Sequence, residues 1–225
     1  MKIAVFDIDG TLTSTNLVDG YYFAISVGSV LEIALEPDWS RFREATDAAI
    51  LAELCAECTR RSYAEVEAEV QEHFFALLDE TVRTDPTAFH PIRGAEGILG
   101  AVRRAGWTPV IATGGWRRSA EIKLSAAGIV TTGVPFASCS DHPDRVAIVR
   151  EAVCRADPTG TASGVVVVGD GLWDLRASQA LGYGFVGRAE GEAAQALLAH
   201  GAVSVVPHFE DSQSFISLLE QTLQS

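Results

Sequence analysis

The sequence predicts an α/β protein with a parallel-sheet core and a helical domain inserted after its first strand. Three observations support this fold class. Short apolar runs alternate with helix-like stretches over about the last three fifths of the chain, the alternation is missing between residues 14 and 91, and polar residues follow several of the apolar runs. Alternating strands and helices are typical of a parallel sheet covered by helices on both faces, which is a Rossmann-like arrangement.

The expected strands are short and continuously apolar, as in strands that are buried on both faces. They are Ile3–Phe6, Pro109–Ala112, Val134–Ala137, Val165–Val168, Phe185–Val186 and Val203–Val206. Helices are predicted between them, at Ala95–Ala105, Trp116–Ala127, Arg145–Arg155, Asp174–Ala180 and Glu192–His200. Each strand–helix–strand unit then crosses over in the same sheet, so the strands' carboxyl ends share one edge.

The segment between the first two strands contains helical spacing and no convincing strand. Two apolar series follow the helical period: Leu17, Tyr21, Ala24, Val27, Leu31 and Leu35, and then Tyr63, Val66, Val70, Phe74 and Leu77. We therefore expect a helical domain over residues 15–91 and a core domain formed by residues 1–14 and 92–225. Thr13–Thr15 and Phe89–Gly94 are the expected hinges, the second because it carries Pro and Gly.

Charge and composition narrow the possible partners. The formal net charge is −13 over 225 residues, and such an acidic surface repels nucleic acid and anionic membranes. No apolar run approaches the ~20 residues of a membrane span, and the first residues do not read as a signal peptide, so we expect a cytoplasmic protein. The four cysteines include Cys55 and Cys58 within a helical pattern, where two reduced thiols are favoured over a metal or redox pair.

Functional groups follow three of the predicted strands. Asp7 and Asp9 end the first strand, Thr113 and Gly114 end the second, and Asp170 ends the fourth with Asp174 four residues later. Because these ends share one edge of the sheet, the side chains are expected to converge. Asp7 and Asp9 share a face if the strand continues through them, and buried like charges are costly unless a cation lies between them.

These motifs resemble those of the haloacid dehalogenase superfamily of phosphohydrolases. "FDIDGTLT" at residues 6–13 is similar to the first motif, "VIATGG" at 110–115 to the second, Arg145 in "SDHPDRVAIV" to the third, and "VVVVGDGLWD" at 165–174 to the fourth. The resemblance covers the whole core in the expected order. The helical insert lies where the C1 subgroup, which includes phosphoglycolate phosphatases, carries its cap domain.

The resemblance implies a Mg²⁺-dependent phosphatase that acts on a small phosphorylated metabolite. Asp7 would be the nucleophile that forms an aspartyl-phosphate, and Asp9 would be the general acid and then the general base. Mg²⁺ would be bound by the Asp7 carboxylate, the backbone carbonyl of Asp9 and Asp170.

The remaining motif residues would handle the phosphate. Thr113 and the Gly114 amide would hold phosphate oxygens near a helix N-terminus. Arg145 would neutralise charge on the phosphoryl group, and Asp174 would orient Arg145 or a metal-bound water.

Other readings of the same core stay open. A phosphomutase uses the same two aspartates, and a non-catalytic module would bind the phosphometabolite without turnover, although such a module would be expected to have lost one of the site residues. A haloalkanoate dehalogenase is disfavoured, because that branch lacks the second aspartate that Asp9 supplies.

Several individual residues also have a structural interpretation. Asp9 could form a turn with Gly10, Asp174 could cap a helix that begins at Leu175, and Arg145 could be a surface charge. Arg118 and Lys123 are most simply surface residues, and Trp116 and Trp173 fit the core and the pocket equally well. In the insert, Thr46 or Asp47 is expected to start a helix, and Arg41 or Arg43 would otherwise reach a second anionic group on the substrate.

Overall fold

The computed structural model describes residues 1–39 and 41–224, and a single parallel sheet forms its centre. Six strands lie in the order β3-β2-β1-β4-β5-β6, and every neighbouring pair is parallel. The strands are β1 (Lys2–Phe6), β2 (Trp107–Thr113), β3 (Phe136–Ser138), β4 (Gly164–Gly169), β5 (Gly184–Arg188) and β6 (Ser204–Val206). All six predicted strands are present, and the predicted Rossmann-like α/β class is confirmed.

Helices cover both faces of this sheet. Successive residues of β1 point to opposite sides, so Ile3 and Val5 enter one apolar cluster while Ala4 and Phe6 enter the other. The first cluster contains side chains of α6 (Arg145–Ala156), α7 (Leu172–Leu181) and α8 (Gly191–Ala199). The second contains side chains of α4 (Ala95–Arg104), α5 (Arg117–Ala126) and α9 (Ser212–Thr222). The continuously apolar strands follow from this double coverage.

Helix α9 was not anticipated from the sequence pattern, and it completes the second face. Phe215 and Leu219 are its buried residues, and Phe215 packs against Phe6 and Phe209 at ring-centroid distances of 6.1 and 4.9 Å. Helix α7 begins at Leu172, two residues before the predicted start. None of the helices in the described part of the chain combines the length and the hydropathy needed to cross a membrane.

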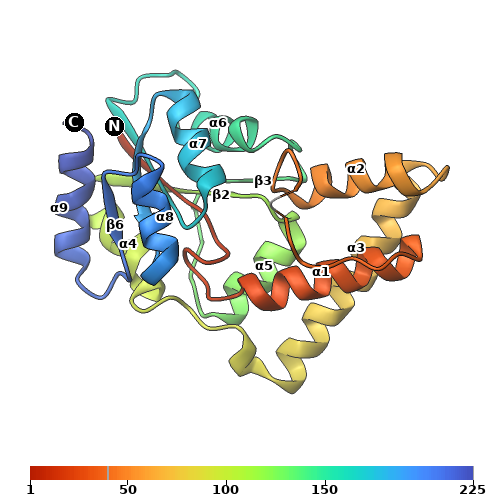
Figure 1. Ribbon diagram of the computed structural model, residues 1–225. Helices are drawn as coiled ribbons and strands as arrows, with labels where there is room; N and C mark the ends of the chain where they lie inside the picture. Colours follow the sequence, from red (N-terminus) through yellow and green to blue (C-terminus); the bar gives the residue numbers. More distant parts are fainter. Residues whose placement is uncertain (40, 225) are drawn as a thin grey trace.

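The insert is helical, as its spacing predicts. It contains α1 (Asn16–Leu31), α2 (Asp47–Cys58), α3 (Tyr63–Thr84) and the short 3₁₀ helix η1 (Pro86–Ala88), and these lie to one side of the sheet (Figure 1). Helix α3 begins with a capping box in which Ser62 and Glu65 exchange hydrogen bonds, an arrangement that satisfies orphan amides of the first turn. Cys55 and Cys58 lie on α2 as free thiols.

The buried face of α1 differs from the predicted one. Leu17 and Tyr21 are 89% and 57% exposed, whereas Phe23 and Val27 are buried. Leu35 lies beyond the helix. Phe23 packs against Phe74 of α3 and Trp116, so the helices of the insert and the α6 face of the sheet share one continuous apolar cluster.

Two connections join the insert to the core, and they run side by side. Thr13 and Pro91 form an isolated antiparallel bridge, and the amide of Ser14 donates to the carbonyl of His90 at 2.8 Å. These two segments are the ones expected to act as hinges, and their motion stays a prediction. Thr46, the N-cap of α2, accepts a hydrogen bond from the Ala49 amide, so the expected helix start after Thr46 is present.

Candidate active site

The ends of β1, β2 and β4 bring together residues that are far apart in the sequence. Asp7 follows β1 directly, Thr113 ends β2, and Asp170 follows β4. The amide of Asp7 donates to the carbonyl of Val168 at 3.0 Å, which ties the first of these ends to the last. Oxygen atoms of Asp7, Asp170 and Asp174 lie within 4.8 Å of one another, so the structure places these three carboxylates in one acidic group.

Arg145 lies at the first turn of α6 and points into this acidic group. Its Nη2 donates to Asp7 Oδ1 at 2.5 Å, and its Nε donates to Asp174 Oδ1 at 3.0 Å. The side chain is only 3% exposed, so it is no surface charge. Burial acts to lower the pKa of the guanidinium, but Asp174 and Asp7 together raise it, and Arg145 stays charged.

Asp174 has two contacts that fix its orientation. Besides binding Arg145, it accepts a hydrogen bond from the Gly171 amide at 3.2 Å and so closes the first turn of α7. The expected contact with Arg145 and the alternative role at a helix start are therefore both present in the geometry. A side chain at Gly169 would collide with Asp174, since an added Cβ would lie 2.4 Å from its carboxyl group.

Asp170 approaches the first motif because Gly10 lacks a side chain. Gly10 has a φ of 77°, and a Cβ at this position would lie 2.0 Å from Asp170 Oδ2. Glycine at this position therefore allows both the left-handed backbone conformation and the close approach of the Asp170 carboxylate. The same Asp170 oxygen accepts a hydrogen bond from Asn16 Nδ2 at 2.8 Å, at the start of α1.

One cation does not neutralise this acidic group. Burial, with added repulsion from Asp174, Asp170 and Asp9, raises the pKa of Asp7 well above its usual value despite the opposing attraction of Arg145. Burial and then Asp174 raise the pKa of Asp170 to about 7, against the hydrogen bond from Asn16 and the attraction of Arg188. Such a surplus of buried negative charge, made of hard oxygen atoms, suits a divalent cation.

The loop after β2 offers hydroxyl and amide groups beside Asp7. Thr113 is 1% exposed, and its Oγ1 accepts a hydrogen bond from the Gly115 amide at 3.2 Å. The Trp116 amide donates to Asp47 Oδ2 at 3.0 Å. The Gly114 amide has no hydrogen-bond partner among the described residues, and it is the amide that the sequence singles out for phosphate. Trp116 itself is buried among aromatic rings, so of its two interpretations the structure supports packing.

Asp9 points away from the acidic group. Its Oδ1 accepts a hydrogen bond from Thr15 Oγ1 at 2.5 Å, and its Oδ2 accepts one from Lys123 Nζ at 2.6 Å. Both carboxylate oxygens are therefore engaged, one by the connection into the insert and one by α5. Its carboxylate therefore lies outside the acidic group. The predicted Mg²⁺ ligand of Asp9 is its backbone carbonyl, and that prediction does not depend on where the carboxylate points.

The prediction that Lys123 is a surface residue is wrong. Its side chain is 0% exposed and binds both Asp9 and, at 2.5 Å, Asp19 of α1. Burial acts to lower the pKa of the ammonium, but Asp19 and Asp9 together outweigh burial and raise it. A signal was available, because Lys123 is spaced three residues from Ala120 on the buried face of α5. Arg118 is exposed and pairs with Asp79 at 3.0 Å, as a surface residue would.

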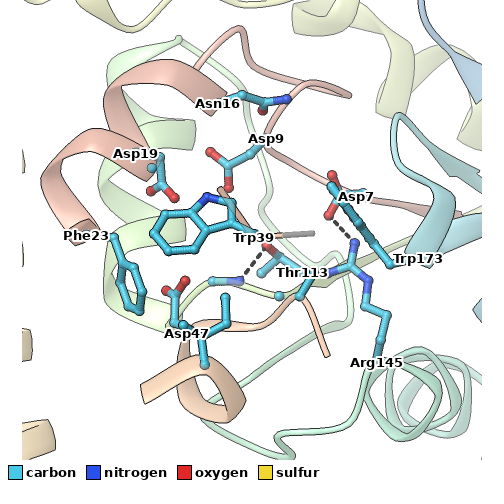
Figure 2. Close-up of a pocket in the computed structure, with 15 residues that line it drawn as sticks. Asp7, Asp9, Asn16, Asp19, Phe23, Trp39, Asp47, Thr113, Arg145 and Trp173 are labelled. Atoms are coloured by element: carbon cyan, nitrogen blue, oxygen red, sulfur yellow. Dashed lines mark hydrogen bonds and ion pairs between the residues drawn. The ribbon is translucent and has the colours of Figure 1, made fainter. Parts of the chain in front are cut away.

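A pocket with a volume of about 140 Å³ extends from this edge of the sheet toward the insert (Figure 2). Figure 2 shows Asp7, Arg145 and Trp173 on one side, Asp19, Phe23 and Asp47 on the other, and Trp39 between them. The lining residues are Asp7, Asp9, Asn16, Asp19, Gly20, Phe23, Trp39, Ala45, Asp47, Ile50, Thr113, Gly114, Gly115, Arg145 and Trp173. Sequence reasoning missed Asn16, Asp19, Phe23 and Ile50 as pocket residues, because only the tertiary contacts carry them to the strand ends.

The haloacid dehalogenase-like hydrolase family model matches residues 4–179, so the chain belongs to this family. The match covers every motif identified in the sequence, from the first aspartate pair to Asp174. Comparison with curated proteins gives no match.

Solved structures share the fold at low sequence identity. A hydrolase from Pseudomonas syringae superposes with a TM-score of 0.74 at 19% identity, covering 97% of this chain and 99% of that one. CbbY from Rhodobacter sphaeroides, in complex with phosphate, superposes with a TM-score of 0.68 at 20% identity, covering 93% of this chain and 95% of that one. A HAD hydrolase of family IA, variant 3, from Entamoeba histolytica gives 0.72 at 14% identity over the whole of both chains. At these identities the likeness concerns the fold.

Proposed function

We propose that this haloacid dehalogenase-like hydrolase is a Mg²⁺-dependent phosphatase that hydrolyses a small phosphorylated metabolite through an aspartyl-phosphate on Asp7. The observation that supports the proposal best is the contact of Arg145 with Asp7 and Asp174 inside a group of three converging carboxylates. A buried arginine held by two carboxylates beside a third strand-end carboxylate has little structural justification, since such an arrangement is costly to bury.

Asp7 is placed to act as the nucleophile. Its carboxylate lies at the pocket surface at the end of β1, next to Thr113 and Gly114. In the first step one Asp7 oxygen forms a bond to phosphorus while the bond from phosphorus to the substrate's leaving oxygen breaks. Thr113 Oγ1 and the Gly114 amide would hold phosphate oxygens, and Arg145 would balance the charge that remains on the phosphoryl group.

Asp9 would supply the proton that the leaving oxygen takes up, and it would later accept a proton from the attacking water. Both oxygens of its carboxylate are bound by Thr15 and Lys123. Proton transfer therefore requires Asp9 to exchange at least one of these contacts for the substrate. Thr15 begins the insert, so movement of the insert and release of Asp9 would be linked.

The acidic group fits a divalent cation by its donors and by its charge. In addition to burial, Asp174 and Asp170 raise the pKa of Asp7, Asp174 raises the pKa of Asp170, and Gly10 keeps open the approach between Asp170 and the first motif. We propose that Asp7, Asp170 and the backbone carbonyl of Asp9 bind Mg²⁺, while Asp174 stays with Arg145 and the Gly171 amide. When bound, the ion would supply positive charge that stabilises the negative charge of the reacting phosphate.

The decisive experiment replaces the nucleophile with its closest neutral analogue. Asp7→Asn should lower kcat on an aryl phosphate by several orders of magnitude while the fold, followed by circular dichroism, is unchanged. A folded variant that retains near wild-type kcat would refute the covalent mechanism. Glu57→Gln, which removes an exposed carboxylate of α2 outside the pocket, serves as the control and should leave kcat unchanged.

Metal dependence is tested on the same substrate. Chelation with EDTA should abolish turnover, and added Mg²⁺ should restore it, because carboxylate sites for Mg²⁺ exchange the ion readily. Full activity after exhaustive chelation would contradict the role of Asp7 and Asp170 as ligands. Release of inorganic phosphate, measured alongside loss of the ester, identifies a phosphatase, whereas a phosphomutase would transfer the phosphoryl group without releasing it.

A further inference from the structure

The end of the pocket that lies toward the insert is lined by acidic and aromatic side chains. Asp19 and Phe23 come from α1, Trp39 from the loop after α1, and Asp47 from the start of α2. Within residues 1–39 and 41–224, the only cationic side chain that lines the pocket is Arg145, which is bound to Asp7 and Asp174. Arg41 and Arg43, which the sequence offered for a second anionic group, do not line it.

Asp47 presents one unused acceptor to this end of the pocket. The residue is 8% exposed, and its Oδ2 accepts a hydrogen bond from the Trp116 amide at 3.0 Å. Its Oδ1 has no hydrogen-bond partner among the described residues. Burial, with added repulsion from Asp19, raises the pKa of Asp47 well above its usual value, although Lys123 and the Trp116 amide oppose the shift. A positive charge in the pocket would relieve both the burial cost and the repulsion.

Lys123 meets this need for positive charge only in part. It attracts Asp47, but its side chain is fully buried, does not line the pocket and is bound by Asp9 and Asp19. Asp9 and Asp19 bind this ammonium directly, and Asp47 is attracted to it without a hydrogen bond or ion pair among the described residues. The pocket side of these three carboxylates keeps negative character, and a ligand with a second anionic group would meet it directly.

Aromatic rings complete the same end. Phe23 packs edge to face with Trp39 at a centroid distance of 5.4 Å, and Trp39 lies across the pocket between the two groups of carboxylates (Figure 2). Gly20 makes room for the indole, since an added Cβ would lie 3.2 Å from Trp39 Nε1. Aromatic faces and carboxylates together are the chemistry that recognises alkylammonium groups.

We propose that the substrate is a phosphate ester whose alcohol carries a positively charged nitrogen, that the ammonium binds among Asp19, Asp47 and Trp39, and that esters with a second anionic group are rejected. This inference rests on the proposed phosphatase function and adds the class of leaving group. The two ends of such a zwitterionic substrate match the two ends of the pocket, with phosphate at Arg145 and ammonium at Asp47.

The test compares three series of esters with the same chain lengths. Wild-type kcat/KM is measured on 2-aminoethyl and 3-aminopropyl phosphate, on the neutral ethyl and propyl phosphates, and on the carboxylate-bearing phosphoglycolate and 3-(phosphonooxy)propionate. We expect the better amino ester to exceed its neutral counterpart about tenfold, and the carboxylate esters to fall at least about tenfold below the neutral ones. Equal rates for the three classes, or a preference for the carboxylates, would overturn the inference.

Variants then locate the selectivity. Asp47→Asn preserves the size of the side chain and an acceptor for the Trp116 amide. It should lower the ratio of kcat/KM on the amino ester to kcat/KM on the neutral ester about tenfold. Asp19→Asn should lower the same ratio, and Glu57→Gln, on the helix of Asp47 but exposed, should leave it unchanged. Because either pocket variant can perturb folding, the ratio within each variant is the readout. An unchanged ratio in both variants would place the selectivity elsewhere and refute the proposal.

A binding measurement separates this inference from the proposed function. Calorimetry with 2-aminoethylphosphonate, ethylphosphonate and phosphonoacetate, all in Mg²⁺ buffer, requires no turnover. If the aminophosphonate binds more tightly but no ester is hydrolysed, the proposed phosphatase activity is refuted and the preference for a positively charged nitrogen is supported. If esters are hydrolysed but the three phosphonates bind equally, the phosphatase activity is supported and the preference is refuted.

Discussion

Two buried cations in this protein have the same kind of partners and different surroundings. Arg145 bridges Asp7 and Asp174, which both belong to the sheet and its crossovers. Lys123 bridges Asp9 of the core and Asp19 of the insert. The first pairing holds parts of the core in place around Asp7, the proposed nucleophile. The second connects two segments that would have to move relative to one another if the insert closes and opens.

The comparison shows how one charge pattern can serve two purposes. Arginine presents a rigid fork that can bind two carboxylates at fixed angles, whereas lysine is a point charge on a flexible chain. A fixed fork suits a site where geometry must be exact to a fraction of an ångström. A flexible ammonium can keep contact with Asp9 while Asp19 shifts.

The largest effect is expected at the rigid fork. Arg145→Met should lower kcat/KM at least about 10³-fold, roughly 4 kcal/mol, because Asp7 loses its cation and the phosphoryl charge loses its partner. Arg145→Lys should recover only part of the loss, since an ammonium cannot bind both carboxylates with the same geometry. Steady-state kinetics on an aryl phosphate gives both values, and Arg150→Met, exposed on the same helix, is the control. If Arg145→Lys keeps the full wild-type kcat/KM, the site does not need the two-pronged geometry of the guanidinium.

The next effect concerns stability at the second cation. Lys123→Met should lower the free energy of unfolding by about 3 kcal/mol, because Asp9 and Asp19 are left buried without a counter-charge. Arg118→Met on the same helix removes only an exposed ion pair with Asp79 and should change the free energy of unfolding by less than about 0.5 kcal/mol. Urea denaturation measures the free energy of unfolding of both variants. Equal effects for the two variants would mean that the buried pairing does not hold the insert to the core.

The smallest effect is a pH dependence carried by Asp19. Burial, opposed by Lys123 and reinforced by Asp9, raises the pKa of Asp19 from 3.8 to about 6 in the folded protein. Between these values the folded state binds more protons than the unfolded chain, so the contribution of Asp19 to stability falls as the pH rises from about 4 to about 7. Asp19→Asn should remove a pH-dependent difference on the order of 2 kcal/mol.

Unfolding free energies of wild type and Asp19→Asn at pH 4.5, 6 and 7.5 test this sign. The stability of the wild type relative to the variant should be greatest at pH 4.5. A relative stability that grows with pH would show that Lys123 lowers the Asp19 pKa below its unfolded value, and the second cation would then resemble an ordinary salt bridge.

Local patterns in the sequence were sufficient for the strands and for the residues that end them. Asp7, Thr113, Asp170 and Asp174 could be assigned to one site because a parallel sheet brings its carboxyl ends together whatever the side-chain detail, whereas Arg145 was assigned only through the family resemblance. The helices of the insert followed from their period. The face that α1 buries did not, because Leu17 and Phe23 fit helical stripes equally well and only packing against α3 selects between them.

The sequence by itself determined the Rossmann-like sheet, the place of the insert and the family motifs, since each depends on neighbours a few residues apart or on rules of topology. The tertiary structure decided that Lys123 is buried, that Asp9 faces Thr15 instead of Asp170, and that, among the residues the structure describes, the insert contributes carboxylates and not arginines to the pocket. The reason is physical: the contact of Lys123 with Asp9 joins residues 114 positions apart. Whether a charge at such a position is solvated or paired depends on which helix packs over it, and no local period encodes that packing.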